Sequence, residues 1–383
     1  MPCLRAGFTN PQAYYLRLIM RVAWVLSLLI TAPLAAQLPA GARLEVVASG
    51  LNNPWGVAFA PDGRVFISER IGRIRVVRDG RLEPEPWLEL STARGGPGLL
   101  GLALPPDFAR RPAVYVVGGF PAPGAGDSAF VNRLLRIPDR DGRAGPVEVL
   151  LDGLPSNRAH AGSAVAFGPD GMLYVTLGDA FRPNAAQQDS SLAGKILRLA
   201  PDGRIPVDNP TAGSLIYARG LRNTQGLAWH PETRTLFATE HGPSGWPWES
   251  GRRDNDELNQ IVRSGNYGWP EVAGPGDQRR FMDPLVTWTP AIAPSGLTFY
   301  TGPYRPWKGQ LFLGALRGRH LRRLTLGQQN GGWRVTSEER LLVSDSVRIR
   351  GTFMGPDGML YFTTSDRRTD GQPDDRLYRI RFQ

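Results

Sequence analysis

Five polar residues, far apart in the chain, each stand a few positions before a similar apolar strand pattern. They are His160, Arg222, Asn223, Arg348 and Arg350. An imidazole titrates near neutral pH and can take a proton from a substrate hydroxyl. Arginines keep their charge even when buried, so several of them around one point require anions. The set therefore indicates a polyanionic ligand beside a general base.

The same residue types allow a second interpretation. The arginines could pair with acids from other loops, such as Asp179 or Glu240, and the histidine could be only a hydrogen-bonding loop residue. Neither spacing nor composition decides between these two interpretations.

A second group of candidate ligands lies in residues 240–267, where acids and a Gly-Pro turn stand close together. Asp254, Asp256 and Glu257 supply hard oxygen donors, and the turn at Gly242 and Pro243 exposes backbone carbonyls. Calcium prefers such ligands, although the spacing is not that of an EF-hand. The alternative is a set of acids that only cap a loop.

These candidates are positioned by a hairpin pattern that occurs six times, with an apolar run, a turn that often reads Pro-Asp-Gly, and a second apolar run. Proline presets φ for the turn and glycine relieves its strained position. The spacing is typical of blades around a common axis, so we predict an all-β fold, a six-bladed β-propeller of four-stranded blades. The repeats begin at Gly56, Gly101, Ala164, Gly226, Gly296 and Gly351.

The first residues of the chain do not fit this pattern. A charge at Arg21, a nine-residue apolar run and small residues near Ala36 are typical of a signal peptide, with Met20 as the expected start of translation. We therefore expect an N-terminal extension and signal peptide over residues 1–36, one propeller domain over 37–383, and an exported periplasmic or extracellular protein. The apolar run is too short for a membrane span, so none is expected after cleavage.

Charge and cysteine content exclude several functions. The only cysteine, Cys3, lies before the signal segment, so neither a disulfide framework nor thiol chemistry is expected in the mature protein. The net charge is +10, but the arginines are scattered and no basic run alternates with aromatics, so nucleic acid is not an expected partner.

From about residue 45 onward the chain resembles the soluble quinoprotein glucose and sorbosone dehydrogenases, and more closely their aldose sugar dehydrogenase branch. The resemblance is carried by HAGSAVAFGPDGMLYVTLGD, GLRNTQGLAWHPET, EHGP, NDELNQIVRSGNYGWP and RIRG, among other segments. It implies a propeller that binds pyrroloquinoline quinone (PQQ) and calcium at its axis and oxidises the anomeric hydroxyl of aldose sugars to lactones.

The resemblance also implies roles for individual residues. His160 matches the general base, Arg222 and Asn223 match the pair at the reactive face of the quinone, and Arg348 and Arg350 match residues that neutralise its carboxylates. The carbonyls of Gly242 and Pro243 match ligands of the calcium that touches the quinone. Asp256, Glu257 and Tyr267 match a neighbouring structural calcium site.

Three positions depart from the family pattern. Gly96 replaces a glutamine, Ala159 replaces an acid before the histidine, and Thr301 replaces a lysine. Without an acid at position 159 to orient and charge-stabilise the imidazole, we expect a weaker base. We also expect weaker quinone binding.

We therefore expect a PQQ-dependent sugar dehydrogenase with a small-molecule sugar substrate and an unidentified electron acceptor. The first alternative is a catalytically weak or inactive propeller that acts as a binding module. The second is a calcium-dependent lactonase, which needs carboxylates at the axis where this chain has arginines.

Overall fold

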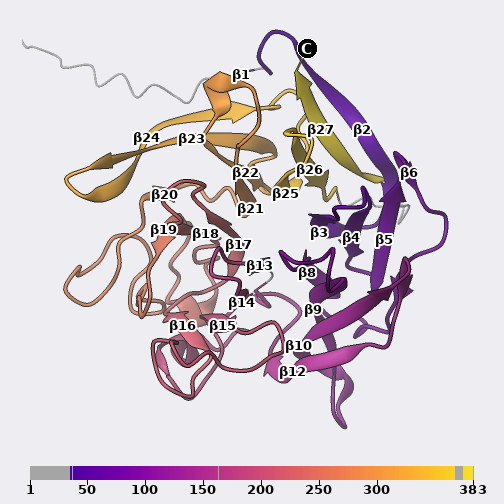
Figure 1. The fold of residues 1–383 in the computed structure, drawn as a ribbon. Coiled ribbons are helices and arrows are strands. Elements are labelled where there is room, and N and C mark those ends of the chain that lie inside the picture. The colour runs from indigo at the N-terminus through magenta and orange to yellow at the C-terminus, as the bar shows by residue number, and fades with distance from the viewer. Residues whose placement is uncertain (1–34, 37, 163, 367–373, 383) are drawn as a thin grey trace, which may run out of the picture. The chain divides into compact units, whose positions relative to one another are not determined.

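The computed structural model describes residues 35–36, 38–162, 164–366 and 374–382. The expected start at Met20 lies outside them, and so does the expected signal peptide apart from its last two residues, 35 and 36. Six sheets of mainly antiparallel strands surround a common axis (Figure 1). The innermost strand of each sheet contacts that of the next, and the last contacts the first, so the ring closes. The predicted six-bladed propeller of four-stranded blades is confirmed.

The first three blades follow chain order from the innermost strand outward, with an extra short strand in two of them. They contain β3 (Pro54–Phe59), β4 (Val65–Glu69), β5 (Arg73–Arg78), β6 (Arg81–Leu82) and β7 (Leu88–Glu89); β8 (Leu99–Ala103), β9 (Ala113–Ala122), β10 (Gly126–Arg140), β11 (Arg143–Ala144) and β12 (Glu148–Pro155); β13 (Val165–Phe167), β14 (Leu173–Leu177), β15 (Lys195–Leu199) and β16 (Ile216–Arg219).

The other three blades are built in the same way, except that the outermost strands of the last two include residues from the beginning of the chain. They contain β17 (Thr224–Trp229), β18 (Leu236–Glu240), β19 (Asp256–Ile261) and β20 (Val286–Trp288); β21 (Pro294–Phe299), β22 (Leu311–Ala315), β23 (His320–Gln329), β24 (Gly332–Leu341) and β1 (Ala35–Ala36); β25 (Ile349–Met354), β26 (Leu360–Thr364), β27 (Asp375–Phe382) and β2 (Ala42–Leu51).

The repeated hairpin supplies the two inner strands of each of the six blades. In the first blade, the turn between β3 and β4 places Gly63 at φ 87°, a conformation that glycine adopts without strain. Ala60, directly after β3, donates its N–H to the carbonyl of Arg64, 2.8 Å away, and so closes the turn. The local pattern therefore fixes the direction of the strand that lines the axis.

The ring is closed by strands from the two ends of the described chain. β2 pairs antiparallel with β27, from Ala42 opposite Phe382 to Leu51 opposite Asp375 (Figure 1). The backbone hydrogen bonds between β2 and β27 therefore join an early and a late segment of the chain in one blade. None of the helices in the described ranges is long and apolar enough to cross a membrane.

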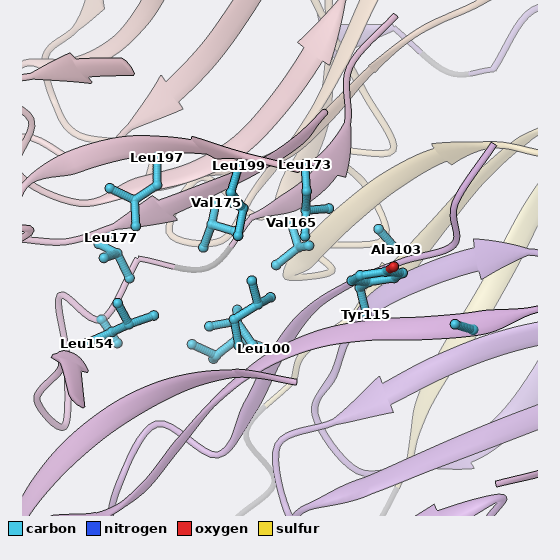
Figure 2. Close-up of a cluster of buried hydrophobic side chains, with 14 residues drawn as sticks. Leu100, Ala103, Tyr115, Leu154, Val165, Leu173, Val175, Leu177, Leu197 and Leu199 are labelled. Carbon is cyan, nitrogen blue, oxygen red and sulfur yellow. The ribbon is translucent and has the colours of Figure 1, made fainter. Parts of the chain in front are cut away.

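The hydrophobic core lies between neighbouring blades. Figure 2 shows one such layer, in which Leu100 and Tyr115 from the second blade face Val165 and Leu173 from the third. Alternate residues of each strand point into such layers, because successive side chains of a strand lie on opposite faces. The blades therefore hold one another in place, and with them the loops at the axis.

The segments between the repeated hairpins contain further regular elements. The long segment between the fourth and fifth repeats, residues 242–283, contains β19, which is the third strand of its blade. Three connections in the described chain contain short 3-10 helices, Pro183–Gln187, Pro247–Glu249 and Arg305–Trp307.

Lys195 at the start of β15 is fully buried and holds residues 185–193 in place by hydrogen bonds. Its ammonium group donates to the carbonyls of Ala185, Ala186 and Ala193 at 2.8–2.9 Å, and burial lowers its pKa to about 8. Lys195→Met should lower the free energy of unfolding by about 3 kcal/mol, roughly 1 kcal/mol for each carbonyl left without its donor.

Urea unfolding followed by circular dichroism measures this effect, and Lys308→Met, which replaces the other lysine at an exposed position, is the matched control. Equal unfolding free energies for the two variants would show that the three carbonyls do not depend on Lys195.

Candidate active site

The structure brings the five residues that stand before the repeated strand pattern into one cavity of about 360 Å³. His160, Arg222, Asn223, Arg348 and Arg350 all line it. They stand at or just before the innermost strands β13, β17 and β25. Equivalent positions in different blades meet at the axis, and this places residues from distant parts of the chain around one cavity.

Two further arginines line the same cavity. They are Arg70 and Arg158, and no aspartate or glutamate is among the described residues of the lining. Arg158 stands two residues before His160 and could have been included from the sequence. Arg70 follows β4 rather than preceding an innermost strand. Its position relative to the repeated strand pattern therefore gave no reason to expect it in the cavity.

Arg70 lies where the sequence departs from the family pattern. Its Nε donates to the carbonyl of Pro97 at 2.8 Å, and a Cβ added at Gly96 would lie 3.0–3.2 Å from Ala93 and Phe130. A glutamine at position 96 would therefore require its neighbours to shift. Thr301, beyond the end of β21, lines a different cavity.

His160 is held in a constrained position. It is 8% exposed, and its backbone has φ 53°, a left-handed conformation that is uncommon outside glycine. A Cβ added at Gly178 would lie 2.1 Å from the His160 carbonyl, so this close approach requires glycine. Such constrained conformations occur at sites where a side chain must be aimed.

A buried acid orients the His160 ring. Nδ1 of His160 lies 2.8 Å from Oδ1 of Asp179, which is 1% exposed and follows β14. The other oxygen of Asp179 accepts a hydrogen bond from Nε1 of Trp269 at 2.9 Å. The expectation that Ala159 leaves the imidazole without an orienting acid is therefore wrong, because the acid comes from the next hairpin.

The charge state of His160 suits proton acceptance. Burial lowers its pKa, Asp179 opposes that change, and the positive charge of Arg222 adds to it. The imidazole is therefore neutral at pH 7, with its Nδ1 proton directed at Asp179. Nε2 is the ring atom left to accept a proton.

Arg222 is paired with an acid, so the second sequence interpretation is correct for this residue. Its Nε donates to Oε1 of the fully buried Glu249 at 2.7 Å, and its Nη groups donate to the His241 carbonyl and to Oγ of Ser244. The acid is neither Asp179 nor Glu240. Glu240 instead accepts a hydrogen bond from the backbone N–H of Arg222.

Amide side chains connect the remaining polar groups of the cavity. Arg350 donates to Oε1 of Gln225 at 3.2 Å, and its guanidinium lies 3.7 Å from the ring centroid of Trp55. Gln225 donates in turn to Oδ1 of Asn223 at 3.0 Å. Arg348 donates to the carbonyls of Ser365 and Leu316, both at 3.0 Å. The cationic groups are thus held in fixed positions.

The structure does not bring the three residues of the predicted structural calcium site to one point. Asp256 and Glu257 are consecutive in β19, so their side chains lie on opposite faces of the sheet. Asp256 accepts the N–H of Gly242 at 2.8 Å and that of Ala293 at 2.7 Å. Asp256 therefore positions the Gly-Pro turn rather than sharing an ion with Glu257.

Other members of the predicted set already have protein partners. The carbonyl of Pro243 accepts the N–H of Asp254 at 2.9 Å, and the Tyr267 hydroxyl donates to the carbonyl of Gln260 at 2.6 Å. Among the described residues, no three histidine, cysteine, aspartate or glutamate side chains form a group that could hold a metal ion.

The face of the fourth blade that carries Glu257 nevertheless offers unsatisfied oxygens. Glu240 lies opposite both Glu257 and Thr224, and Asn259 lies two residues beyond Glu257. Oε2 of Glu240, Oδ1 of Asn259 and Oγ1 of Thr224 are buried, with no hydrogen-bond partner among the described residues.

The two glutamates of this face disfavour each other's charge. Burial and the charge of Glu257 raise the pKa of Glu240 well above its usual range, and burial raises the pKa of Glu257. A hard cation would satisfy the buried oxygens and relieve the repulsion.

Comparisons with known proteins match nearly the whole propeller. A family model described as Glucose / Sorbosone dehydrogenase matches residues 51–379, which include all six innermost strands. The chain is 30% identical to the aldose sugar dehydrogenase YliI of Escherichia coli K12, over 86% of this chain and 91% of that protein.

Two solved structures agree with this match. An oxidoreductase (glucose dehydrogenase) from Thermus thermophilus is 43% identical, with a TM-score of 0.78 over 89% of this chain and 100% of that one. The PQQ-bound aldose sugar dehydrogenase of Streptomyces coelicolor is 31% identical, with a TM-score of 0.72 over 91% of this chain and 100% of that one.

Proposed function

This chain belongs to the glucose/sorbosone dehydrogenase family, and from that membership we propose that it is a PQQ- and calcium-dependent dehydrogenase of aldose sugars. The proposed reaction oxidises the anomeric hydroxyl to a lactone. The observation that supports it most directly is a cavity lined by five arginines around a neutral, buried histidine that an acid orients.

The cavity suits a cofactor with three carboxylates. Arg348 and Arg350 come from the sixth blade, and Arg70 and Arg158 come from the first and the third. Arginine pairs well with carboxylates because its planar fork of donors matches their geometry. Arg222 is fixed by Glu249, so its role here is to present an oriented guanidinium beside Asn223.

His160 would handle the substrate proton. When bound, the quinone would accept a hydride from the anomeric carbon while Nε2 of His160 takes the proton of the anomeric hydroxyl, leaving the lactone. Asp179 keeps the Nδ1 proton in place and stabilises the imidazolium as it forms. Burial keeps water away from the base, and the pKa lowered by burial keeps it neutral before the reaction.

Calcium is proposed at two places in the fourth blade. The carbonyls of Gly242 and Pro243 would hold an ion against the cofactor, where it would stabilise negative charge on a quinone oxygen. The face of Glu257 would hold a second ion, with Glu240 and Asn259 as additional side-chain ligands. This set differs from the predicted one, because Asp256 points away from it and is held by Gly242 and Ala293.

The protein is proposed to act outside the cytoplasm, because the layout of its first 36 residues is that of a signal peptide. A small-molecule sugar would be its substrate, and the electron acceptor that reoxidises the quinone remains to be identified.

A dye-reduction assay tests the proposal. The purified protein, loaded with PQQ and calcium, should reduce 2,6-dichlorophenolindophenol in the presence of glucose or another aldose and form the corresponding aldonic acid. Omission of PQQ, or removal of calcium with a chelator, should abolish the activity, and added calcium should restore it after chelation. Rescue by magnesium alone would contradict the calcium part of the proposal.

The binding-module alternative predicts a different outcome in the same experiment. PQQ would bind, and its absorbance would remain with the protein after free PQQ is removed. The loaded protein would nevertheless reduce the dye with none of the aldoses. The Asp179–His160 pair argues against this alternative, since it supplies the orienting acid that position 159 lacks.

A further inference from the structure

A pair of exposed tryptophans stands beside the cavity. Trp246 and Trp248 stack with their ring centroids 5.1 Å apart and their planes 6° apart. They are 45% and 47% exposed, although tryptophan is among the side chains that gain most from burial. An exposed apolar surface of this kind in a soluble protein often marks a binding site.

The pair is continuous with the proposed active site. Trp246 and Phe181 both line the cavity. Phe181 packs against His160 with 4.5 Å between ring centroids, and against Trp248 with 5.8 Å. An aromatic surface therefore extends from the proposed base to the open side of the cavity, with Trp248 as the support behind Trp246.

The backbone at Trp246 is held in place by the buried acid that also fixes Arg222. Oε2 of Glu249 accepts the backbone N–H groups of Ser244 and Trp246, at 2.8 and 3.0 Å, while its other oxygen binds Arg222. Glu249 is the last residue of the 3-10 helix Pro247–Glu249. The tryptophan segment and the cavity arginine are therefore positioned together, so little ordering is required when a ligand binds.

The form of this surface suits a sugar ring. The two indoles already cover one face of each other, so Trp246 keeps a single open face, a ledge rather than a slot that could enclose a flat aromatic molecule. One face of a pyranose consists mainly of C–H groups and packs on an indole, while its hydroxyl groups point outward to water. A neutral ring of this kind also needs no charged partner on the ledge.

We propose that Trp246, supported by Trp248, forms a second sugar-binding subsite. It would take the neighbouring unit of a disaccharide or longer oligosaccharide whose reducing end lies at His160. This inference rests on the proposed oxidation of aldoses, and it specifies oligosaccharides with a free reducing end as the preferred substrates. Chain-length preference, rather than chemistry at the anomeric carbon, is the property that the pair controls.

Kinetics with sugars of different length test the subsite. The ratio of kcat/KM for maltose to kcat/KM for glucose should fall about tenfold in Trp246→Ala, the loss expected for one aromatic contact. Cellobiose serves as a second disaccharide with a different linkage. Trp246→Phe keeps an aromatic face and should recover most of the ratio. Val207→Ser, which changes a fully exposed apolar residue before β16, is the control.

Binding without turnover separates this proposal from the one on which it rests. Isothermal titration of the protein with maltotriose should give a dissociation constant about tenfold weaker in Trp246→Ala than in the unchanged protein. If no sugar is oxidised but this difference is found, the subsite stands and the proposed dehydrogenase activity fails.

Two results would overturn the subsite. The first is active enzyme whose maltose-to-glucose ratio is the same in Trp246→Ala and in the unchanged protein. The second is an unchanged sugar ratio together with a raised KM for 2,6-dichlorophenolindophenol, which would make the tryptophans a contact for the electron acceptor. Thermal unfolding of each variant shows that any loss does not arise from misfolding.

Discussion

His160→Ala is expected to lower turnover at saturating quinone by about 10³–10⁴-fold, the upper part of the range for a positioned general base. The sequence alone predicted a weaker base, and therefore a smaller loss within that range, because Ala159 cannot orient the ring. The structure places Asp179 2.8 Å from Nδ1, so the base that the substitution removes is oriented and charge-stabilised. Stopped-flow reduction of bound quinone by sugar measures the step in which the proton is removed.

Quinone binding provides the matched control for this result. It should change little in His160→Ala, because the carboxylates are expected to be bound by arginines. Arg348→Ala should do the reverse and weaken quinone binding about 10–100-fold, the usual cost of losing a charged hydrogen bond. Near-normal turnover in His160→Ala would mean that another group removes the proton and that the role transferred to His160 is wrong.

Asp179→Asn is expected to reduce turnover on the order of 10³-fold while leaving the cavity arginines in place. An asparagine amide can donate to Nδ1 of His160, and this favours the tautomer that carries its proton on Nε2. That tautomer cannot accept a proton from the sugar. Asp202→Asn, at an acid paired with Arg204 on the surface, is the matched control.

The pH dependence distinguishes a positioning role from a merely structural one. Because the pKa of His160 lies below 6.5, activity should be retained at pH 6.5 and lost as the pH falls through the lowered value. Asp179 acts to raise that pKa, so its removal should move the acid limb of kcat/KM to still lower pH. An unmoved acid limb with reduced activity would show that Asp179 only supports the fold.

The sequence itself determined the propeller and the residues that gather at its axis. Each hairpin repeat carries its own turn residues and its own strand alternation, so the pattern specifies the blade locally. Because equivalent positions of all blades meet at the axis, the position of His160 and Arg348 before the repeated strands was enough to predict that they line one cavity. Strand alternation also contained the information that Asp256 and Glu257 face opposite ways, once β19 is recognised as a strand.

Only the tertiary structure decided which charged groups face one another. Asp179 reaches His160 from the following hairpin, and Glu249 reaches Arg222 from a long connection whose course no local pattern predicts. Arg70 enters the cavity from the position directly after the second strand of the first blade. Such contacts depend on how blades pack and how loops fold back over the axis. Local propensity determines strands and turns, whereas packing between distant segments determines the partners of buried charges.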